Sequence, residues 1–492
     1  MADKQQICNP FLPLWEHVPD GEPHVFGDRV YLFGSHDKEG GETFCMLDYT
    51  CWSAPVTDLT DWRCEGTIYR AEQDPDYPRR KYMYAPDVVQ GNDGRYYLYY
   101  CMSGEFGHGG YHGPICVAVC DTPAGKYEYI GFVRNPDGTP MQTYVCFDPA
   151  VINDNGTIRL YYGTQYDYEE REDFPGKDDK YLLAEMEMFG KSREEILGTP
   201  ESVMGPCTLT LCDDMLTVKD APRHIIPYRV KGTSFEGHPF FEAASMRKVG
   251  GKYYFVYSSQ KNHELCYAVS DKPDRDFVFG GTIVSNGDVG YQGRDDADRL
   301  NMTGTTHGSI IEIGGQWYVF YHRLTHKSDY SRQACAERIE IRPDGSIPQV
   351  PITSCGLNGG ALRGIGSYPA PIACIITNGH MPHGSNKIFT EHFPHVTHEG
   401  KAHLIAEISN GTRIGFRYFD MAANCTLTLT TRGAAGRYSI SDESGTVFGT
   451  AEIPASDDWQ DTAVTLAVTA GVHPLLLTWQ GEETALLQIA FS

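Results

Sequence analysis

The chain has 492 residues, of which 41% are hydrophobic, 22% charged and 12% aromatic. This composition is typical of a folded globular protein, and the length predicts one large and one small domain. The net charge of -24, from 41 Lys and Arg against 65 Asp and Glu, argues against nucleic acid and anionic membranes as partners.

The first two thirds of the sequence contain a repeat. A glycine or asparagine turn followed by an aromatic or aliphatic strand occurs as "GDRVYLFGS" (27–35), "DGRYYLYYC" (93–101), "NGTIRLYYGT" (155–164), "GGKYYFVYSS" (250–259) and "GGQWYVFYH" (314–322). The equivalent positions Tyr31, Tyr97, Leu160, Tyr254 and Tyr318 are spaced by 66, 63, 94 and 64 residues. Short strands in such regular units predict a five-bladed β-propeller, with an insertion of roughly one hairpin in the longest interval. A β-sandwich with coincidentally aromatic strands is the alternative.

Each unit also carries one ionisable residue ten to twelve positions before the repeated position. These residues are Asp20, Asp87, Asp148, Glu242 and His307. In a propeller the strand that precedes the repeated one lies innermost, so we expect these side chains to converge on the central channel. Taken singly, the aspartates are typical turn caps and the histidine is typical of a hydrogen-bonded core residue; their common phase favours a site.

Glu242 has a conspicuously apolar setting in "GHPFFEAASMRKVGGKYYFVYSS". A carboxylate in apolar surroundings is costly unless it is paired, and burial raises its pKa. We therefore expect Glu242 to hold its proton near neutral pH, helped by the charge of Asp148. Asp20, in a polar turn with glycine, is expected to stay ionised, so the two carboxyl groups suit acid and base roles in glycoside hydrolysis.

At these residues the chain resembles the family 43 glycoside hydrolases, over about residues 8 to 345. The resemblance implies a five-bladed propeller that hydrolyses arabinosides and xylosides with inversion. It assigns the general base to Asp20 in "PDGEPHVFGDRVYLFGSHD", a pKa-tuning and orienting carboxylate to Asp148 in "CFDPAVINDNG", and the general acid to Glu242 in "FFEAASMRKVGGKYYF".

The same resemblance suggests further site residues. "YAPDVVQGNDGRYYLYY" is similar to the family's Trp-Ala-Pro-Asp segment, with Tyr84 in place of Trp and Asp87 as the acid. Tyr84, Asp87, Phe241 and Arg332 are expected to bind the substrate. His307, in "THGSIIEIGGQWYVFYH", is expected at the channel centre near a structural calcium ion or its waters, and the chemistry itself requires no cofactor.

Two acidic residues compete with these assignments. The family usually follows its base with proline, whereas this chain has Asp20-Gly21-Glu22-Pro23, which leaves Glu22 as a rival base. Glu236, in "FEGHPFFEA", competes with Glu242 in the same way. The distance from the repeated strand favours Asp20 and Glu242.

The composition and the hydropathy pattern of the sequence change after residue 345. We expect a propeller domain over 1–345, a connector rich in Gly and Pro over 346–378, and an antiparallel β-sandwich over 379–492, where apolar and polar residues alternate. "GTRIGFRYFD" and "GVHPLLLTWQG" resemble the family 6-like carbohydrate-binding modules. Trp459, Trp479 and Tyr418 are candidates for a sugar platform, but core positions and a purely structural cap are the alternatives.

The fifteen cysteines are scattered, lack a Cys-x-x-Cys pair and often lie in strand-like runs, which indicates reduced, buried thiols. The amino-terminal segment lacks the apolar run of a signal peptide, and no stretch of about 20 apolar residues occurs. A soluble, cytoplasmic protein is the expectation.

The sequence therefore predicts an all-β enzyme, an inverting glycosidase that releases β-D-xylosyl or α-L-arabinofuranosyl units from oligosaccharides derived from plant polysaccharides such as xylan. A cytoplasmic location favours small substrates and an exo mode. The alternative is a non-catalytic propeller that binds carbohydrate. The sequence does not indicate the oligomeric state.

Overall fold

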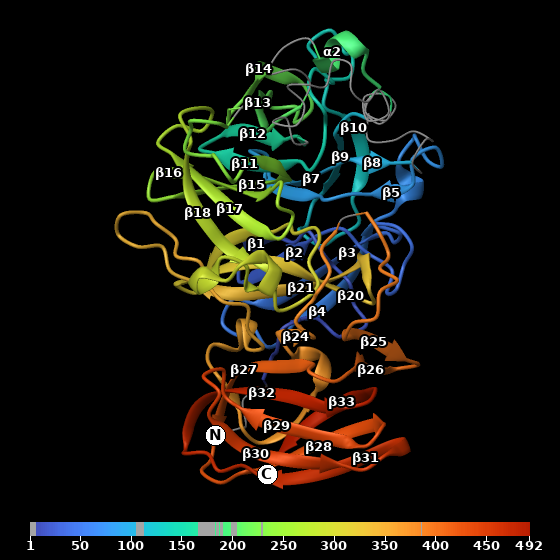
Figure 1. Cartoon of the computed structure of the whole chain (residues 1–492). Helices are drawn as coiled ribbons and strands as arrows, with labels where there is room; N and C mark the ends of the chain where they lie inside the picture. Colours follow the sequence, from blue (N-terminus) through green and yellow to red (C-terminus); the bar gives the residue numbers. More distant parts are fainter. Residues whose placement is uncertain are drawn as a thin grey trace.

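The computed structural model describes residues 6–104, 113–165, 190–197, 204–227, 230–384 and 386–492, together with Leu183 and Met186. Its regular structure is almost wholly β, as predicted (Figure 1). Aromatic and β-branched residues fill the central strands, as in "KYYFVYSS", where they pack on both faces of a sheet. Among the described residues, no helix has the length and apolar character needed to cross a membrane.

The first part of the molecule, residues 22–339, contains five antiparallel sheets and is called the five-sheet part. Within each sheet the strands lie side by side in the order of the chain. Sheet one has β1 (Glu22–Phe26), β2 (Arg29–Phe33), β3 (Tyr49–Pro55) and β4 (Arg63–Tyr69); sheet two has β6 (Asp87–Gln90), β7 (Tyr96–Tyr100), β9 (Cys116–Cys120) and β10 (Glu128–Phe132). Sheet three has β11 (Ala150–Asp154), β12 (Thr157–Tyr162), β13 (Cys207–Leu211) and β14 (Val218–His224); sheet four has β15 (Phe240–Val249), β16 (Lys252–Ser259), β17 (Glu264–Ser270) and β18 (Val278–Ser285). Sheet five has β19 (Ser309–Ile313), β20 (Gln316–Thr325) and β21 (Ser328–Ile339), and a small ladder joins β5 (Tyr82–Met83) to β8 (Met102–Ser103).

The first strands of the five sheets contact one another in turn. β1 lies beside β6, β6 beside β11, β11 beside β15, β15 beside β19, and β19 beside β1. The five repeated strands found in the sequence are β2, β7, β12, β16 and β20, the second strand of each sheet. The repeat therefore located equivalent positions in all five sheets.

The polar residues that precede the repeated strands do not all lie within strands. Asp87 begins β6 and Glu242 lies in β15, but Asp20, Asp148 and His307 stand in the two residues just before β1, β11 and β19. At these positions the backbone leaves the sheet, and Asp20 and Asp148 adopt φ of 57° and 46°. Left-handed backbone at non-glycine residues is uncommon and concentrates at functional sites.

The longest interval of the repeat falls between β12 and β16. It contains β13, β14, β15, the short helix α2 (Arg193–Leu197), and a stretch that is largely outside the described residues. The predicted insertion falls on that stretch and so lies outside the described residues.

The second part, residues 362–491, contains two six-stranded sheets and is called the two-sheet part. One sheet has β22 (Leu362–Arg363), β24 (Ile375–Thr377), β27 (Arg413–Met421), β29 (Gly436–Ser441), β30 (Val447–Ile453) and β32 (Gly471–Gly481). The other has β23 (Gly366–Pro369), β25 (His395–Glu399), β26 (Ala402–Ile408), β28 (Thr426–Gly433), β31 (Ser456–Thr465) and β33 (Thr484–Phe491). The strands β22, β23 and β24 lie within the predicted connector, so that segment is partly built into the sheets.

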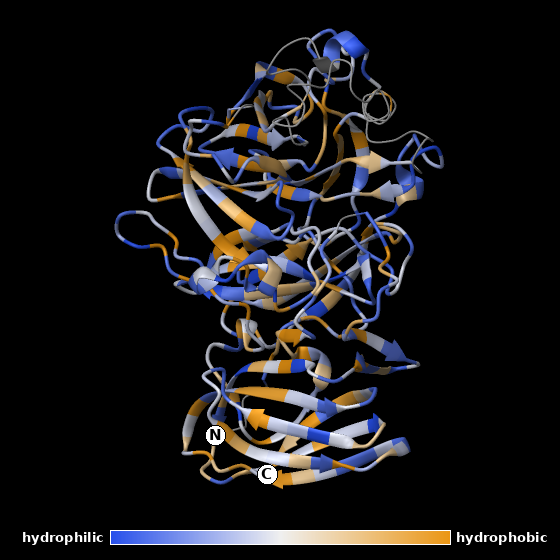
Figure 2. Ribbon diagram, in the orientation of Figure 1, coloured by the Kyte–Doolittle hydropathy of each residue, from blue (hydrophilic) through white to orange (hydrophobic). Residues whose placement is uncertain are grey.

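Apolar side chains from both sheets of the second part share one core. Phe416 and Trp479 come from the first sheet, and Leu427 and Ile489 from the second. Figure 2 shows apolar and polar bands alternating along these strands, which is the period-two pattern read from the sequence. Trp479 is fully buried, so it is a core residue and not part of an exposed sugar platform.

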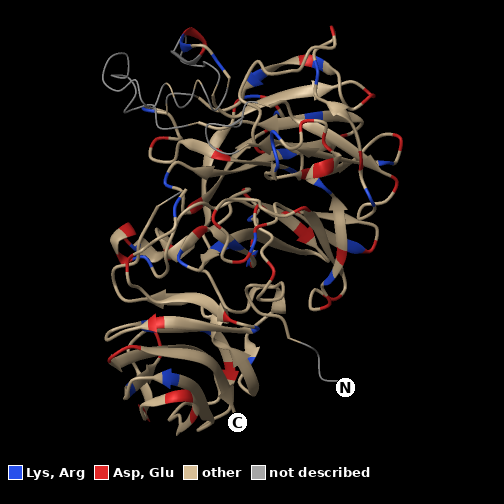
Figure 3. Ribbon diagram, turned by 90° about the vertical axis from the view of Figure 1, so that its right-hand side faces the viewer, with Lys and Arg blue, Asp and Glu red and all other residues tan. Residues whose placement is uncertain are grey.

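The two parts are joined by backbone hydrogen bonds as well as by the chain. His326 N, in the turn between β20 and β21, donates to Val396 O on β25 at 2.8 Å. The start of the described chain also reaches the second part, where Gln6 Nε2 donates to Tyr368 Oη at 2.6 Å. Figure 3 shows acidic and basic residues interspersed along the chain in both parts.

Candidate active site

Asp20 is a buried carboxylate held by a buried cation. Arg332 Nη1, from β21, donates to Asp20 Oδ1 at 2.8 Å, and the two side chains are 6% and 5% exposed. Although burial alone raises the pKa of a carboxyl group, Arg332, and after it His307 and His322, hold the pKa of Asp20 below its ordinary value. Asp20 is therefore ionised at neutral pH, the state that a general base requires.

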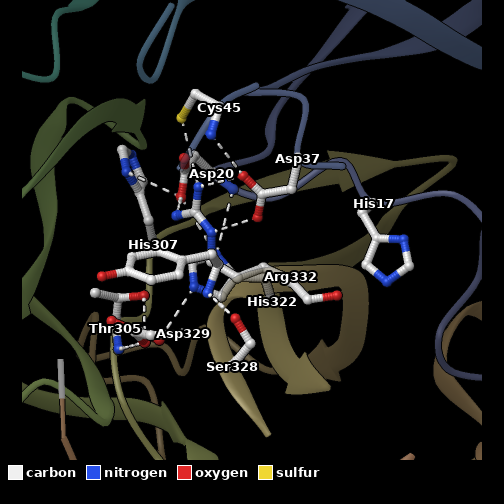
Figure 4. Close-up of polar contacts among 12 residues, drawn as sticks. His17, Asp20, Asp37, Cys45, Thr305, His307, His322, Ser328, Asp329 and Arg332 are labelled. Carbon is white, nitrogen blue, oxygen red and sulfur yellow. Dashed lines mark hydrogen bonds and ion pairs between the residues drawn. The ribbon is translucent and has the colours of Figure 1, made fainter. Parts of the chain in front are cut away.

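Arg332 is itself fixed by a second carboxylate. Its Nε and Nη2 donate to the two oxygens of Asp37 at 2.8 and 3.1 Å, and its guanidinium lies 4.7 Å from the centre of the Phe44 ring. Figure 4 shows Arg332 between Asp37 and Asp20. A forked pairing of this kind fixes orientation as well as charge. Arg332 thus positions Asp20.

Glu242 has the opposite environment. It is half-buried on β15, and none of the described residues forms a hydrogen bond or ion pair with it. Burial, then the charges of Asp148 and Asp20, raise its pKa well above the ordinary value. A carboxyl group that keeps its proton and meets no hydrogen-bond partner among the described residues is suited to donate that proton to a bound molecule.

An irregularity of β15 presents Glu242. The pairing of β15 with β16 shifts between Phe240 and Glu242 and again between Glu242 and Ser245, and Ala243 has φ of 67°. Bulges of this kind re-aim side chains and are frequent beside active sites. The aromatic strand thus buries Phe240 while Glu242 leaves the regular ladder.

Asp148 connects the acid to the rest of the site. Its Oδ2 accepts a hydrogen bond from Ala243 N, the residue after Glu242, at 2.9 Å. Burial, then the charge of Asp20, raises the pKa of Asp148 well above its ordinary value. Asp148 thus adds negative charge near Glu242, and it fixes the backbone of the residue that follows Glu242.

His307 lies between two of the carboxylates. Its Nδ1 is 3.8 Å from Asp20 Oδ1 and 3.6 Å from Asp148 Oδ2. Burial lowers its pKa, so the imidazole is neutral at neutral pH. The residue that follows, Gly308, lies against the backbone of β20, where an added Cβ would stand 1.8 Å from Phe320 O. Only glycine fits there, which fixes the entry of β19 beside His307.

Asp87 is fully buried and its carboxylate joins three strands. Oδ1 accepts from Val88 N at 2.7 Å and lies 2.6 Å from His24 Nε2 on β1, while Oδ2 accepts from Val151 N on β11 at 2.7 Å. Asp87 thereby links the first strands of three sheets. Its contact with the substrate stays a prediction.

The two aromatic candidates are partly accessible, since Tyr84 and Phe241 are both half-buried. The Tyr84 ring lies 5.6 Å from the ring of Phe147, which is next to Asp148. Half-buried aromatic rings next to the carboxyl groups suit stacking on a sugar.

The two rival acids, Glu22 and Glu236, each have other partners. Glu22 is buried and its Oε2 accepts from Arg247 Nη2 at 2.6 Å; burial above all, with the charge of Asp87, raises its pKa to about 7 despite Arg247. Glu236 is exposed and accepts from Gly232 N at 3.0 Å. The geometry therefore favours Asp20 and Glu242.

Three functional neighbours were missed from the sequence. Asp37 holds Arg332; His322 Nδ1 lies 3.4 Å from Asp20 Oδ1; and buried Asp329, whose pKa burial raises to about 6, adds to the field at Glu242. Asp37 and Asp329 lie in polar runs that border a repeated strand, "GSHDKEGGE" and "KSDYSRQ", and His322 lies near the end of the repeated strand β20. That border was the available signal.

The centre also holds a donor set for a cation. Ligand atoms of Glu22, His24 and Asp87 lie within 4.8 Å of one another, and Glu22 Oε1 is buried without a hydrogen-bond partner among the described residues. Carboxylate oxygens are the ligands that calcium prefers. Because Asp87 is already engaged by His24 and backbone amides, Glu22 Oε1 is the free donor, and the set fits an ion that keeps most of its waters.

Comparisons with known proteins agree with this geometry. Residues 8–196 match the model for glycosyl hydrolases family 43. The chain is 41% identical to a xylosidase/arabinosidase of Thermoclostridium stercorarium, covering 99% of this chain and 98% of that protein, and 31% identical to xylosidase/arabinosidase 43A of Humicola insolens, covering 68% and 98%. A solved structure of a GH43_1 enzyme from Xanthomonas citri, complexed with xylotriose, aligns with a TM-score of 0.53 at 24% identity, over 70% of this chain and 94% of that one; this likeness concerns the fold.

Proposed function

This chain belongs to glycosyl hydrolase family 43 and is a glycosidase, and from that premise we propose that it releases xylose or arabinose units from oligosaccharides by inversion. The observation that carries the mechanism is the pair of oppositely shifted carboxyl groups. Asp20 is kept ionised by Arg332, whereas burial and negative neighbours keep Glu242 protonated. Such a pair supplies the base and the acid of one glycoside hydrolysis.

The proton path follows from these states. Asp20 removes a proton from water as the water attacks the anomeric carbon, and Glu242 gives its proton to the departing oxygen. The C–O bond to the leaving group breaks as the bond to water forms, so the configuration at the anomeric carbon inverts. Asp148 orients Glu242 and raises its pKa, and Arg332 and Asp37 orient Asp20. We assign Tyr84 and Phe241 to sugar contact, and Arg332 and Asp87 to positioning.

The architecture proposed for this site is a closed five-bladed propeller. Cyclic contacts among β1, β6, β11, β15 and β19 support it, because they bring one strand of each sheet to a common axis. Residues 1–345 would form this domain and 379–492 a β-sandwich similar to the family 6-like carbohydrate-binding modules. The shared core of the two six-stranded sheets supports the sandwich.

The proposal also includes a bound calcium ion and a cellular setting. A calcium ion held by Glu22 and water near His307 would supply positive charge at the centre of the channel. A reducing, cytoplasmic setting is supported by the fifteen cysteines, all of which are free thiols.

The stereochemistry of the first product tests the mechanism. Proton NMR of the sugar formed in the first minutes from an aryl β-D-xyloside should show the α anomer before mutarotation. A β anomer at first appearance would overturn the inverting assignment, and no release from aryl xylosides and arabinofuranosides alike would overturn the substrate class.

A further inference from the structure

A second buried cluster of ionisable residues lies where the five-sheet part meets the two-sheet part. It consists of His17, Glu39, His326, His398 and His403 and is called the histidine cluster. Glu39 and His326 come from the five-sheet part, His17 lies just before its first strand, and His398 and His403 come from β25 and β26 of the two-sheet part. The catalytic scheme uses none of them.

The ligand atoms of four members point at one another. Glu39 Oε1 lies 2.8 Å from His403 Nε2, 3.2 Å from His398 Nδ1 and 3.5 Å from His326 Nε2, and His326 Nε2 is 3.0 Å from His398 Nδ1. Around a tetrahedral zinc ion with bonds of about 2.0 to 2.1 Å, neighbouring ligand atoms stand roughly 3.3 Å apart. The observed spacings scatter around that value.

Two hydroxyl groups hold the ring of His326 through its Nδ1. This atom lies 2.9 Å from Thr325 Oγ1 and 3.2 Å from Ser331 Oγ, and Thr325 Oγ1 donates to Ser331 O at 3.1 Å. When Nδ1 donates to one of these hydroxyl oxygens, Nε2 presents a bare lone pair to Glu39 and His398. A neutral ring held through its other nitrogen is the usual state of a metal-binding histidine.

The backbone holds His326 in this place at a cost. His326 and Lys327 form the two-residue turn between β20 and β21 with φ of 58° and 51°. Such turns strongly prefer Asn and Gly, because other side chains are strained there. Across the cluster, His398 and His403 are paired directly opposite each other in the hairpin of β25 and β26. Both elements therefore present their histidines from fixed positions.

We propose that Glu39, His326, His398 and His403 bind a divalent transition-metal ion of the zinc type, which joins the two parts of the molecule. Three imidazoles and one carboxylate are a donor set suited to zinc or cobalt and poorly suited to calcium or magnesium. His17 stands behind the set, with its Nε2 3.4 Å from Thr325 Oγ1. The side chains of His403 and His326 are 7% and 8% exposed, and that of His398 is 35% exposed, which leaves the ion a path from solvent.

The test uses the full chain, stripped with a chelator and then dialysed. Cobalt chloride or zinc chloride is titrated alone, and bound metal is measured by mass spectrometry, calorimetry and the visible absorption of tetrahedral cobalt. We expect one ion per chain, intense cobalt bands, a higher unfolding temperature on loading, and no displacement by excess calcium. A chain that binds no stoichiometric cobalt or zinc would overturn the proposal.

Variants locate the ion. His398→Ala and His326→Ala should each weaken cobalt binding by at least about 10- to 100-fold, the loss typical even of outer-shell partners. His392→Ala is the matched control, because His392 lies on the same segment, is 52% exposed and pairs with Glu483 outside the cluster. Cobalt binding that survives in the His326→Ala, His398→Ala double variant refutes the site. Because His398→Ala removes a partly exposed side chain, it serves if His326→Ala does not fold, and glycosidase activity reports folding independently of the metal.

Discussion

The active centre and the histidine cluster are neighbours that share three stretches of chain. Residues 17–20 supply His17 and Asp20, residues 37–39 supply Asp37 and Glu39, and residues 326–332 supply His326 and Arg332. Asp37 N donates to His17 O at 2.9 Å, so the two groups share backbone contacts. In each stretch one residue serves each centre.

The two centres differ in how negative charge is balanced. At the active centre Arg332, a cation that belongs to the chain, pairs with both Asp20 and Asp37. In the histidine cluster Glu39 faces imidazoles, and burial lowers the pKa of His17 to about 4 and that of His326 to about 3, so those two rings carry no charge at neutral pH. A permanent cation suits a base that must stay ionised in every turnover, whereas neutral ligands leave room for a cation from solution.

The largest expected effect is the loss of the acid. Glu242→Gln keeps the shape of the side chain but has no acidic proton, so kcat should fall about 100- to 10,000-fold. The loss should be much smaller for an aryl xyloside whose phenol has a low pKa, because that leaving group departs without protonation. Glu236→Gln, at the exposed rival position, is the control and should keep wild-type rates. Equal losses for good and poor leaving groups would contradict the acid role.

The next effect concerns the cation at the active centre. Activity needs Asp20 ionised, so it is lost as the pH falls through the pKa of Asp20. It also needs Glu242 protonated, so it is lost as the pH rises through the raised pKa of Glu242. Arg332→Lys weakens the forked pairing and should lower kcat about 10- to 100-fold. It should also move the acidic limb of kcat/KM to higher pH while the basic limb moves less. A uniform loss at every pH would mean that Arg332 acts only structurally.

A smaller effect separates the two centres through residues of the same loop. Asp37→Asn weakens the hold on Arg332 and should lower kcat about tenfold more than Glu39→Gln does. Glu39→Gln should instead have the larger effect on cobalt binding by the stripped protein. Steady-state kinetics and cobalt titration of both variants give the comparison. If both variants lost kcat and metal in parallel, the centres would be one coupled unit.

The sequence predicted one centre well because that centre repeats. Asp20, Asp148, Glu242 and His307 recur at a fixed distance before an aromatic strand, and the structure brings them together. Asp87 has the same spacing, but its carboxylate is engaged in contacts within the protein, because its position in β6 lies within reach of His24 and the amide of Val151. Periodicity gives the place of a residue and not the partners that surround it.

The histidine cluster could not be predicted in this way. Its members, at positions 17, 39, 326, 398 and 403, come from both parts of the molecule, share no period and lie in loops and a hairpin. Their meeting depends on how the two parts pack, which local patterns do not encode. The irregular pairing on either side of Glu242 was hidden for a similar reason, since it depends on the contact of β15 with β16.

The smallest effect tests whether the turn that carries His326 is strained. Lys327 has φ of 51°, and its Nζ donates to both oxygens of Glu407 at 2.9 Å. Lys327→Ala loses this ion pair and keeps the strain, whereas Lys327→Gly loses the pair and relieves the strain. We therefore expect Lys327→Gly to be more stable than Lys327→Ala by about 1 kcal/mol in chemical unfolding, although glycine is usually the less stable residue. If Lys327→Ala were instead the more stable variant, the turn would not be strained. Backbone strain at His326 would then play no part in the binding of cobalt.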